Sequence, residues 1–506
     1  MSGRESTRRG FLGASIATGI GAAIASTADA RKHHRHKHKH RRRRRRRPIT
    51  PKVDYVVVGA GFAGLTAARS IAGAGKSVMV LEARDRVDGR VPNLDLGNGA
   101  VTERGGTFVG PTQDHVLALA EALGIGLFDT YDTGDNVYLS NGQRSTFSDT
   151  SPTGSAPADP VILPDLTTVV TQLDQMSTEV PVDAPWTAAK AAQYDAQTLQ
   201  SWLEQNSVTP QFRQLATTAC EPIFGSESRE LSLLYVLFYI ASSGNETNPG
   251  TFERNFNTRQ GAQQWRFQGG SQLIPLKIAS DLGSSVVLSS PVRRIVQSGG
   301  GVQVVSDKVT VNAKKVIVAV PPTLAGRIDY SPDLPTERDQ FTQRVPQGSL
   351  VKAGAVYEKP WWRDKGLTGS SVSTDGLVSA TFDDSPEDAG LGVLFGFIGG
   401  DKARQFNTMA PDDRQSQVLA EFSTLFGPEA GSPQRYFETN WTAEPWSRGC
   451  PVALYGPGTL TAYGPALRKP VGNIHWAGTE TSNYWNGYMD GAVRSGDRAA
   501  KEVLAG

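Results

Sequence analysis

Residues 53–64 read VDYVVVGAGFAG and join an apolar run to the glycine pattern G-x-G-x-x-G. The apolar run predicts a buried strand. Gly59 permits a tight turn after the strand, and Gly61 allows a pyrophosphate to approach the backbone. Gly64 allows the following helix to pack closely on the strand. The helix expected over residues 65–72 would direct its N-terminal N–H groups at the phosphates.

An acidic residue follows at the spacing that dinucleotide binding requires. A second predicted strand, residues 77–81, ends at Glu82, eighteen residues after Gly64. A carboxylate there can accept hydrogen bonds from both hydroxyls of an adenosine ribose. Because strand, glycines, helix, strand and acid stand in register, the sequence predicts a dinucleotide-binding unit rather than an isolated glycine-rich turn.

The charge distribution limits the classes of partner. The 506-residue chain has a formal net charge of +2, but residues 31–47 contain twelve Lys or Arg, five His and no acid. The body from Pro48 onward carries more acidic than basic side chains. We therefore expect the body to bind no specific nucleic acid. The length allows two or three packed domains.

The first thirty residues predict an export signal. Residues 6–12, STRRGFL, resemble a twin-arginine signal, a weakly apolar run follows, and residues 28–30, ADA, form a small-x-small cleavage site. We expect the twin-arginine machinery to export the protein to the periplasm, the cell surface or the medium. A tail with a chance Arg pair is the alternative.

The basic tract behind this signal, residues 31–47, cannot form a core. We expect a disordered spacer or a loose electrostatic contact with anionic surfaces. Weak metal binding by its His residues is a less favoured alternative. The body has only two cysteines, Cys220 and Cys450, which is too few for a disulfide framework, although an exported protein could pair them. No dense Cys/His cluster predicts a metal site.

Farther along the chain the pattern changes from helical to extended. Residues 144–165 predict a surface loop, and residues 166–243 are mainly helical. The stretch 231–241 is apolar nearly all round, so it is buried or lines a cavity. Residues 285–288, 292–296, 302–305, 315–320, 349–357 and 474–476 predict strands, residues 366–400 predict antiparallel strands with turns, and helices are expected over 114–123, 412–425 and 488–504.

Several separated motifs together resemble the flavin-dependent amine oxidases of the monoamine oxidase family. The resemblance extends from about residue 52 to 505. It is carried by residues 59–64, 81–87, 105–113, 348–352, 446–450, 477–481 and 487–493. It implies an α/β fold: a discontinuous Rossmann-like FAD-binding domain and an α+β substrate domain of mixed sheet and helices. The expected boundaries are 1–30 for the signal peptide, 31–47 for the basic tract, 48–130, 256–325 and 436–506 for the FAD-binding domain, and 131–255 and 326–435 for the substrate domain.

The resemblance also implies where FAD binds. Arg84 and Arg90 would neutralise the pyrophosphate, unless the charged turn pairs with itself. Glu480 stands before the last helix, whose first amides would face the flavin pyrimidine. The expected cofactor-binding residues are Gly59, Gly61, Phe62, Ala63, Gly64, Glu82, Ala83, Arg84, Arg90, Gly105, Gly106, Thr107, Phe108, Val292, Trp441, Cys450, Glu480, Tyr488 and Met489.

Two residues are expected to be catalytic. Lys352 lies in an apolar strand, where a charge is costly. By resemblance it holds a water against flavin N5, and an edge-strand lysine that reaches solvent is the alternative. Tyr488 matches one of the two aromatic walls that orient the amine. Pro451 stands where the second wall is usual, which leaves the substrate size open.

Two other positions carry specific expectations. Cys450 matches the position at which mammalian monoamine oxidases attach the flavin through a thioether, so FAD is expected to be covalently bound there. A buried free thiol or a disulfide with Cys220 are the alternatives. Asp88 replaces the glycine usual in the family, and we expect it to face solvent in an Asp-Gly turn, with pairing to an Arg as the alternative.

The sequence therefore predicts an exported FAD-dependent amine oxidase. It would convert a primary amine to an aldehyde, ammonia and hydrogen peroxide by hydride transfer to flavin N5, with O2 as the second substrate. An L-amino acid oxidase, which needs a pocket Arg, and a polyamine oxidase, which needs an acidic pocket, remain alternatives. A non-catalytic polyanion-binding surface protein is the alternative of another class. The amine and the oligomeric state remain open.

Overall fold

The computed structural model describes residues 50–151, 154, 156–388 and 390–505. The export signal and the basic tract predicted within residues 1–47 lie outside the described residues. Everything below concerns one compact unit, Thr50–Gly506. Within the described part of the chain, no helix combines the length and apolar character needed to cross a membrane.

A five-stranded parallel sheet contains the glycine-rich segment. Its strands, in spatial order, are β10 (Val286–Val287), β2 (Val78–Leu81), β1 (Tyr55–Val58), β14 (Lys315–Val318) and β21 (Ile474–Trp476). Every residue of β1 is buried, as its unbroken apolar run predicts. Because the strands come from three distant parts of the chain, this sheet has the discontinuous construction expected of the FAD-binding domain.

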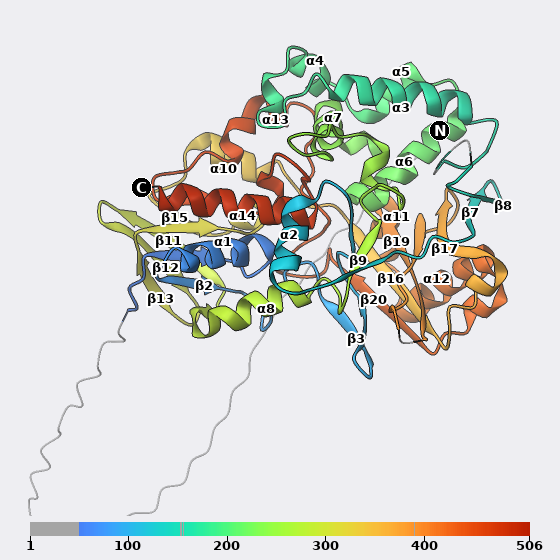
Figure 1. Ribbon diagram of the computed structural model, residues 1–506. Coiled ribbons are helices and arrows are strands. Elements are labelled where there is room, and N and C mark those ends of the chain that lie inside the picture. Colours follow the sequence, from blue (N-terminus) through green and yellow to red (C-terminus); the bar gives the residue numbers. More distant parts are fainter. Residues whose placement is uncertain (1–49, 152–153, 155, 389, 506) are drawn as a thin grey trace, which may run out of the picture. The chain divides into compact units, whose positions relative to one another are not determined.

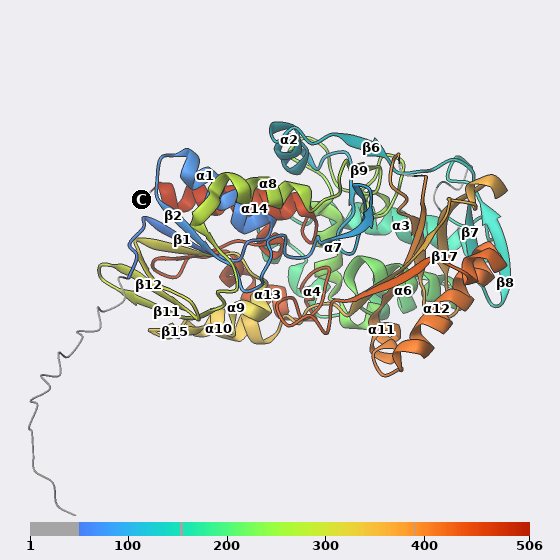
Figure 2. The same cartoon turned by 90° about the horizontal axis from the view of Figure 1, so that it is seen from below.

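Two helices cover one face of this sheet. They are α1 (Phe62–Gly73), which begins three residues earlier than predicted, and α14 (Met489–Leu504). Figure 1 and Figure 2 show them side by side. A Cβ atom on Gly64 of α1 would lie 2.0 Å from the carbonyl oxygen of Gly59, and one on Gly496 of α14 would lie 2.4 Å from that of Ala63. Glycine is therefore required at both contacts, as predicted for Gly64.

A four-stranded sheet shares a hydrophobic core with the parallel sheet. Its order is β13 (Thr310–Ala313), β12 (Gly301–Ser306), β11 (Val292–Ser298) and β15 (Asp329–Ser331). The β11–β12–β13 pairs are antiparallel, and β15 runs parallel to β11. Val292 begins β11 and is half-buried.

A seven-stranded mixed sheet forms the second large layer. Its order is β20 (Arg435–Asn440), β16 (Leu350–Tyr357), β19 (Gly392–Gly399), β18 (Ala380–Asp383), β17 (Leu367–Ser373), β7 (Asp135–Ser140) and β8 (Gln143–Phe147). Only the β17–β7 pair is parallel among these described strands. Because β16 lies between β20 and β19 and every residue of it is buried, Lys352 is not on an edge strand.

Two boundaries differ from the prediction. The segment expected to be a loop over 144–165 begins with β8, a mostly exposed hairpin strand whose polar sequence QRSTF gives no alternating apolar signal. The sheet of the expected substrate domain also continues through β20 to Asn440, past the predicted boundary at residue 436. The pairing of β20 with β16 causes this difference, since both strands belong to one sheet.

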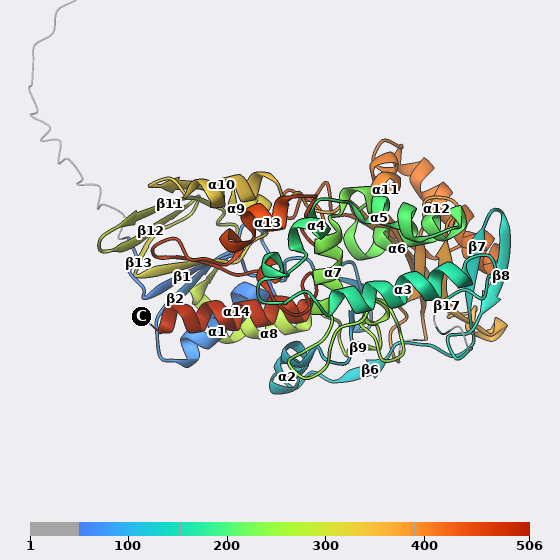
Figure 3. The ribbon, with the colours of Figure 1, turned by 90° about the horizontal axis from the view of Figure 1, so that it is seen from above.

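The segment predicted to be helical over residues 166–243 forms a helical layer. It contains α3 (Leu163–Ser177), α4 (Ala191–Asp195), α5 (Leu199–Asn206), α6 (Pro210–Phe224) and α7 (Leu233–Ser242). Figure 1 and Figure 3 show α3, α5, α6 and α7 grouped together. Nearly all of α7 is buried, because its side chains are apolar around the whole helix.

The remaining strands and α-helices pack around these layers. They are β3 (Asn93–Gly97), β4 (Ala100–Glu103), β5 (Phe108–Val109), β6 (Leu127–Asp129), β9 (Trp265–Phe267), α2 (Asp114–Ala122), α8 (Leu273–Leu282), α9 (Pro322–Ala325), α10 (Thr336–Gln343), α11 (Gly400–Phe406), α12 (Pro411–Phe426) and α13 (Thr459–Tyr463). The strands β3 and β4 form a hairpin, and β9 lies between β5 and β6.

Candidate active site

A cavity of about 1010 Å³ lies among the glycine turn, the seven-stranded sheet and the helical layer. Most predicted site residues line it: Gly59, Gly61, Phe62, Ala63, Glu82, Arg84, Arg90, Gly105, Gly106, Thr107, Phe108, Lys352, Trp441, Cys450, Tyr488 and Met489. Four predicted residues do not: Gly64, Ala83, Val292 and Glu480. Gly64 contacts β1, Ala83 and Val292 are half-buried, and Glu480 is buried beside Arg90.

The glycine-turn end of the cavity has the polar groups that a dinucleotide requires. Two backbone N–H groups hold the Glu82 carboxylate, that of Ala60 at 2.7 Å and that of Arg84 at 2.9 Å. The first N–H groups of α1 receive no cap from a side chain among the described residues. They are therefore free to bind an anion at the positive end of the helix dipole. This end of the cavity fits an adenine dinucleotide.

Both predicted phosphate-binding arginines are already paired with carboxylates. Arg84 donates from Nε to Glu444 at 3.1 Å and from Nη2 to the hydroxyl of Ser447 at 2.8 Å. Arg90 donates to Glu480 at 2.9 Å and to the carbonyl of Pro451 at 2.6 Å. These pairs fix the guanidinium groups in place. The positive charge that each arginine presents to the cavity is therefore partly neutralised by its carboxylate partner.

The prediction that Asp88 faces solvent is wrong. Asp88 is 1% exposed and has a φ of +111°. Its carboxylate pairs with Arg86 and accepts a hydrogen bond from Gln272, the residue that precedes α8. Burial lowers the pKa of Arg86. Asp-Gly still makes a turn, but the turn is covered, and its carboxylate is satisfied by the neighbouring Arg86 and by the distant Gln272.

Gly105 and Gly106 bring backbone without side chains to the cavity wall, close to the start of α14. A Cβ atom on Gly106 would lie 3.2 Å from a methyl carbon of Val91 and 3.9 Å from the sulfur of Met489. Met489 is the first residue of α14, whose N-terminus receives no side-chain cap from the described residues. The uncapped N–H groups suit a partner that gains negative charge.

Lys352 reaches this wall of the cavity from the central strand β16. Its side chain is 1% exposed. The ammonium nitrogen donates to the Thr107 hydroxyl at 2.7 Å and to the Gly105 carbonyl at 3.3 Å, and it lies 3.7 Å from the centre of the Phe395 ring. Burial lowers the pKa of Lys352, and the nearby Asp384 opposes that shift.

Three charged residues that the sequence analysis missed lie behind Lys352. They are Glu103, Arg266 and Asp384, each almost fully buried. Burial raises the pKa of Glu103 to about 7. A lysine in an apolar strand does indicate that a counter-ion is needed. The sequence could not identify it, because the three residues come from segments far from Lys352 and from each other.

Cys450 and Trp441 pack together on the same wall. They share a small apolar cluster with Leu350. Burial raises the pKa of the Cys450 thiol far above its usual range. Cys220, on α6, also lines the cavity, and both cysteines are free in the described structure. The disulfide alternative is therefore not formed.

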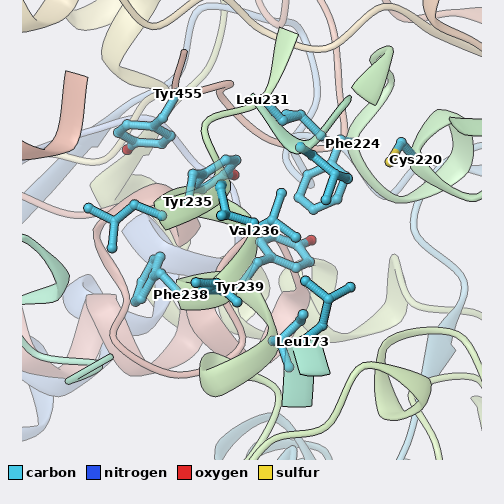
Figure 4. Packing of buried hydrophobic residues seen from close by; sticks show 14 of the residues in the cluster. Leu173, Cys220, Phe224, Leu231, Tyr235, Val236, Phe238, Tyr239 and Tyr455 are labelled. Atoms are coloured by element: carbon cyan, nitrogen blue, oxygen red, sulfur yellow. The ribbon is translucent and has the colours of Figure 1, made fainter. Parts of the chain in front are cut away.

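Beyond Tyr488 the cavity extends into an apolar region between α3, α6 and α7. Figure 4 shows side chains of this region, including Leu173, Phe224 and Tyr239. The rings of Phe224 and Tyr239 have their centres 4.6 Å apart, and Tyr239 lies 5.9 Å from Tyr488. The Tyr488 hydroxyl donates to the carbonyl of Asn255 at 2.8 Å, which fixes the ring. Such a wall favours an apolar ligand.

The cavity-lining arginine near this apolar region is already paired with carboxylates. Arg259, which lines the cavity, contacts the carboxylates of Asp132 and Asp149, each at 2.8 Å. Its charge is therefore compensated. A ligand carboxylate would have to compete with two carboxylates that the protein already supplies.

Comparison with known proteins agrees with this geometry. The family model described as "Flavin containing amine oxidoreductase" matches residues 62–504. AofH of Mycobacterium tuberculosis, which carries the name of a flavin-containing monoamine oxidase, is 42% identical over 453 residues, covering 90% of this chain and 97% of the relative.

Two solved structures have the same fold. A putrescine oxidase bound to putrescine superposes with a TM-score of 0.85 at 31% identity, over 90% of this chain and 99% of that chain. Cyclohexylamine oxidase from Brevibacterium oxydans IH-35A gives a TM-score of 0.85 at 33% identity, again over 90% of this chain and 99% of that chain.

Proposed function

This chain belongs to the family of flavin-containing amine oxidoreductases, and on that premise we propose that it oxidises an apolar primary monoamine to an aldehyde, ammonia and hydrogen peroxide. The enzyme class, the FAD cofactor and the fold class are those predicted from the sequence. When bound in this cavity, FAD would supply the two-electron redox chemistry that couples oxidation of the amine to reduction of O2.

One observation carries the choice of substrate. The cavity continues past Tyr488 into a region walled by apolar and aromatic side chains, whereas Arg259, which also lines it, is paired with two carboxylates. An apolar wall penalises an ammonium ion, so the amine binds in its neutral form. The Tyr488 ring would position the amine, and the Lys352 ammonium places a positive charge at the wall of the same cavity.

The relatives include a structure of putrescine oxidase bound to putrescine, a diamine, so a diamine is the alternative substrate. A distal ammonium group would need an unpaired carboxylate in the apolar region. Glu253 lines the cavity, and burial raises its pKa, which disfavours its charged form. An apolar monoamine therefore suits this cavity better than a diamine.

Anaerobic mixing of the purified yellow protein with single substrates tests the proposal. We expect phenethylamine and cyclohexylamine to bleach the flavin rapidly. Putrescine and L-phenylalanine should bleach it at least about tenfold more slowly, which corresponds to an activation free energy higher by about 1.4 kcal/mol or more. Readmission of air should release hydrogen peroxide. Faster bleaching by putrescine or L-phenylalanine than by either monoamine would overturn the substrate assignment.

We also propose that Cys450 attaches FAD covalently. The thiol lines the cavity beside Trp441, on the wall that Lys352 reaches. After denaturation in acid, the yellow colour should remain with the polypeptide and should leave it in Cys450→Ala. Cys220→Ala is the matched control, because it removes another buried thiol from the same cavity. Colour released from the unsubstituted protein would rule out the bond.

Export is a further proposal, supported by the twin-arginine pattern in residues 6–12. Replacing Arg8 and Arg9 together by Lys keeps the charge and removes the motif. We expect the exported protein to accumulate in the cytoplasm as a result. Unchanged export of the Lys-Lys variant would contradict the twin-arginine route.

A further inference from the structure

Lys352 ends in a pocket that leaves its ammonium group little freedom. Two oxygen atoms, the Thr107 hydroxyl and the Gly105 carbonyl, accept its hydrogen bonds, and the Phe395 ring covers it. Thr107 and Gly105 themselves line the cavity. On the other side, the nitrogen lies 3.8 Å from Oδ2 of Asp384.

Asp384 is itself held by fixed partners. It directly follows β18 and is fully buried. Its Oδ2 atom accepts hydrogen bonds from the Thr102 hydroxyl and, at 3.1 Å, from the Glu103 backbone N–H. Its Oδ1 atom lies 2.9 Å from Nη2 of Arg266. The carboxylate therefore stays ionised and oriented, and Asp384 does not line the cavity.

Arg266 connects Asp384 to a second carboxylate. From β9, its Nη2 atom also donates to Oε2 of Glu103 at 2.8 Å, and Nη1 donates to the carbonyl of Ser385 at 2.7 Å. Lys352, Asp384, Arg266 and Glu103 thus form a buried tetrad of two basic and two acidic side chains, in which burial raises the pKa of Glu103 to about 7. Its members come from β4, β9, β16 and the end of β18.

We propose that Asp384 is the positioning residue for Lys352, and that Arg266 and Glu103 hold Asp384 so that the lysine ammonium stays charged and fixed at the cavity wall. Of the four residues, only Lys352 lines the active-site cavity, so the other three act through it. The inference deepens the proposed function, since this wall faces the flavin only if FAD occupies the cavity as proposed.

The energetic argument follows from burial. An ammonium group taken out of water loses several kcal/mol of solvation, and a lone one would release its proton. The ionisable groups that face Lys352 are Asp384, Glu103, Arg266 and Cys450. Of these, Asp384 acts most strongly to keep the pKa of Lys352 high, whereas burial and Arg266 lower that pKa.

The consequence is a defined response to substitution. Replacing Asp384 by Asn removes the negative charge nearest to the ammonium and keeps the size of the side chain. The pKa of Lys352 must then fall, and a larger fraction of the lysine is neutral at neutral pH. A purely structural role for Asp384 predicts lower stability with no change in how Lys352 titrates.

The direct test is the titration of Lys352 by NMR in holoenzyme labelled with [ε-13C]lysine, with the resonance assigned by its absence in Lys352→Met. We expect a lower pKa of Lys352 in Asp384→Asn. The matched control is Asp383→Asn, because Asp383 is equally buried but binds Trp362 and Arg363 instead. An unchanged pKa in Asp384→Asn, or an equal shift in Asp383→Asn, would overturn the proposal.

A second variant keeps the test decisive if Asp384→Asn fails to fold. Glu103→Gln removes the outer carboxylate while the Lys352–Asp384 ion pair remains. We expect a smaller shift of the Lys352 pKa in the same direction. No shift in this variant would likewise contradict the tetrad.

A kinetic measurement shows whether Asp384 acts through Lys352. The flavin is reduced by light in the absence of any amine, and its reoxidation by O2 is followed across pH. In Asp384→Asn the rate should begin to fall at a lower pH than in the unsubstituted enzyme, because the ammonium is lost earlier. In a Lys352→Met background the same substitution should change the rate by less than about twofold.

A large additional loss in the double variant would mean that Asp384 acts independently of Lys352. Neither the NMR titration nor the reoxidation experiment uses an amine. If no amine bleaches the flavin, the proposed substrate fails while the tetrad is still tested.

Discussion

Glu221 illustrates how the fold controls the charge of a single side chain. It lies on α6, is 3% exposed, and contacts Lys402 of α11 at 3.2 Å. Burial raises the pKa of Glu221 to about 7, and Lys402 only partly opposes this. The cost of burying the charge therefore exceeds the gain from the pair.

The first prediction concerns the pH dependence of stability at Glu221. Between its ordinary pKa of 4.5 and about 7, the folded protein holds a proton that the unfolded chain has released. The free energy of unfolding should therefore fall as pH rises through this window, by up to about 1.4 kcal/mol per pH unit from this residue. Glu221→Gln should flatten the fall, as measured by urea denaturation from pH 5 to 8. Glu204→Gln, on the exposed side of α5, should not.

The second prediction concerns the ring of Tyr488. Tyr488→Leu removes an aromatic wall of the cavity and should slow flavin reduction by phenethylamine about threefold to tenfold, the usual worth of an aromatic contact. Tyr488→Phe keeps the ring and loses only the hydrogen bond to Asn255. It should react at nearly the original rate. Equal losses in both variants would show that the hydroxyl group, not the ring, matters.

Single residues also show how far sequence reasoning extends. The burial of Lys352 follows from the apolar strand around it. The burial of Asp88 does not follow from its neighbours, because Gln272, which satisfies its carboxylate, lies far away in the sequence. Short patterns thus predict where a polar group is costly, and only the fold shows what compensates that cost.

At the scale of elements, the contact between α1 and β1 depends on a missing side chain. Gly64 lies where any Cβ atom would meet the carbonyl oxygen of Gly59. Gly73 ends the same helix, and a Cβ atom there would meet nothing within 4 Å. The helix therefore contains one glycine at which a side chain would clash and one at which a side chain would fit.

The third prediction compares these two glycines. Gly64→Ala should destabilise the protein by about 1–3 kcal/mol through overpacking and should lower its FAD content. Gly73→Ala should be neutral or stabilising by up to about 1 kcal/mol, because alanine favours a helix. Thermal unfolding and the ratio of flavin to protein absorbance measure both effects. Equal behaviour of the two variants would refute the close-contact argument.

Elements with a strong periodic signal were predicted to within a few residues. The strand β21 matches its prediction fully, and α14 begins one residue after the predicted start. The hairpin strand β8 was missed, because its exposed polar residues give no apolar alternation and only pairing with β7 makes it a strand.

At the scale of the whole molecule, the catalytic unit is contained in one part of the chain. Among the residues that the structure describes, those that line the cavity fall between Gly59 and Ala492. Residues 1–49 precede this part of the chain.

The fourth prediction follows from this separation. Deletion of residues 2–49 should leave kcat and KM for phenethylamine unchanged. The same deletion should abolish any salt-sensitive binding to anionic vesicles, because the basic tract is lost. Steady-state kinetics and vesicle co-sedimentation check the two outcomes. A loss of turnover would show that the N-terminal segment takes part in catalysis.

The discontinuous arrangement of the fold came from the family resemblance, whereas local patterns supplied the individual strands. No pattern near Glu103 or Arg266 indicates that they meet Lys352. Their meeting depends on how β4, β9 and β16 are brought together, which is a property of the tertiary structure alone.

The position of α14 has a consequence for biosynthesis. The glycine turn emerges from the ribosome well before the wall that contains Met489, because the two lie far apart in the sequence. In a nascent chain that lacks this helix, one wall of the cavity is missing. Firm capture of the cofactor should therefore await the synthesis of α14. If the protein leaves the cytoplasm already folded, maturation is confined to the interval between translation and transport.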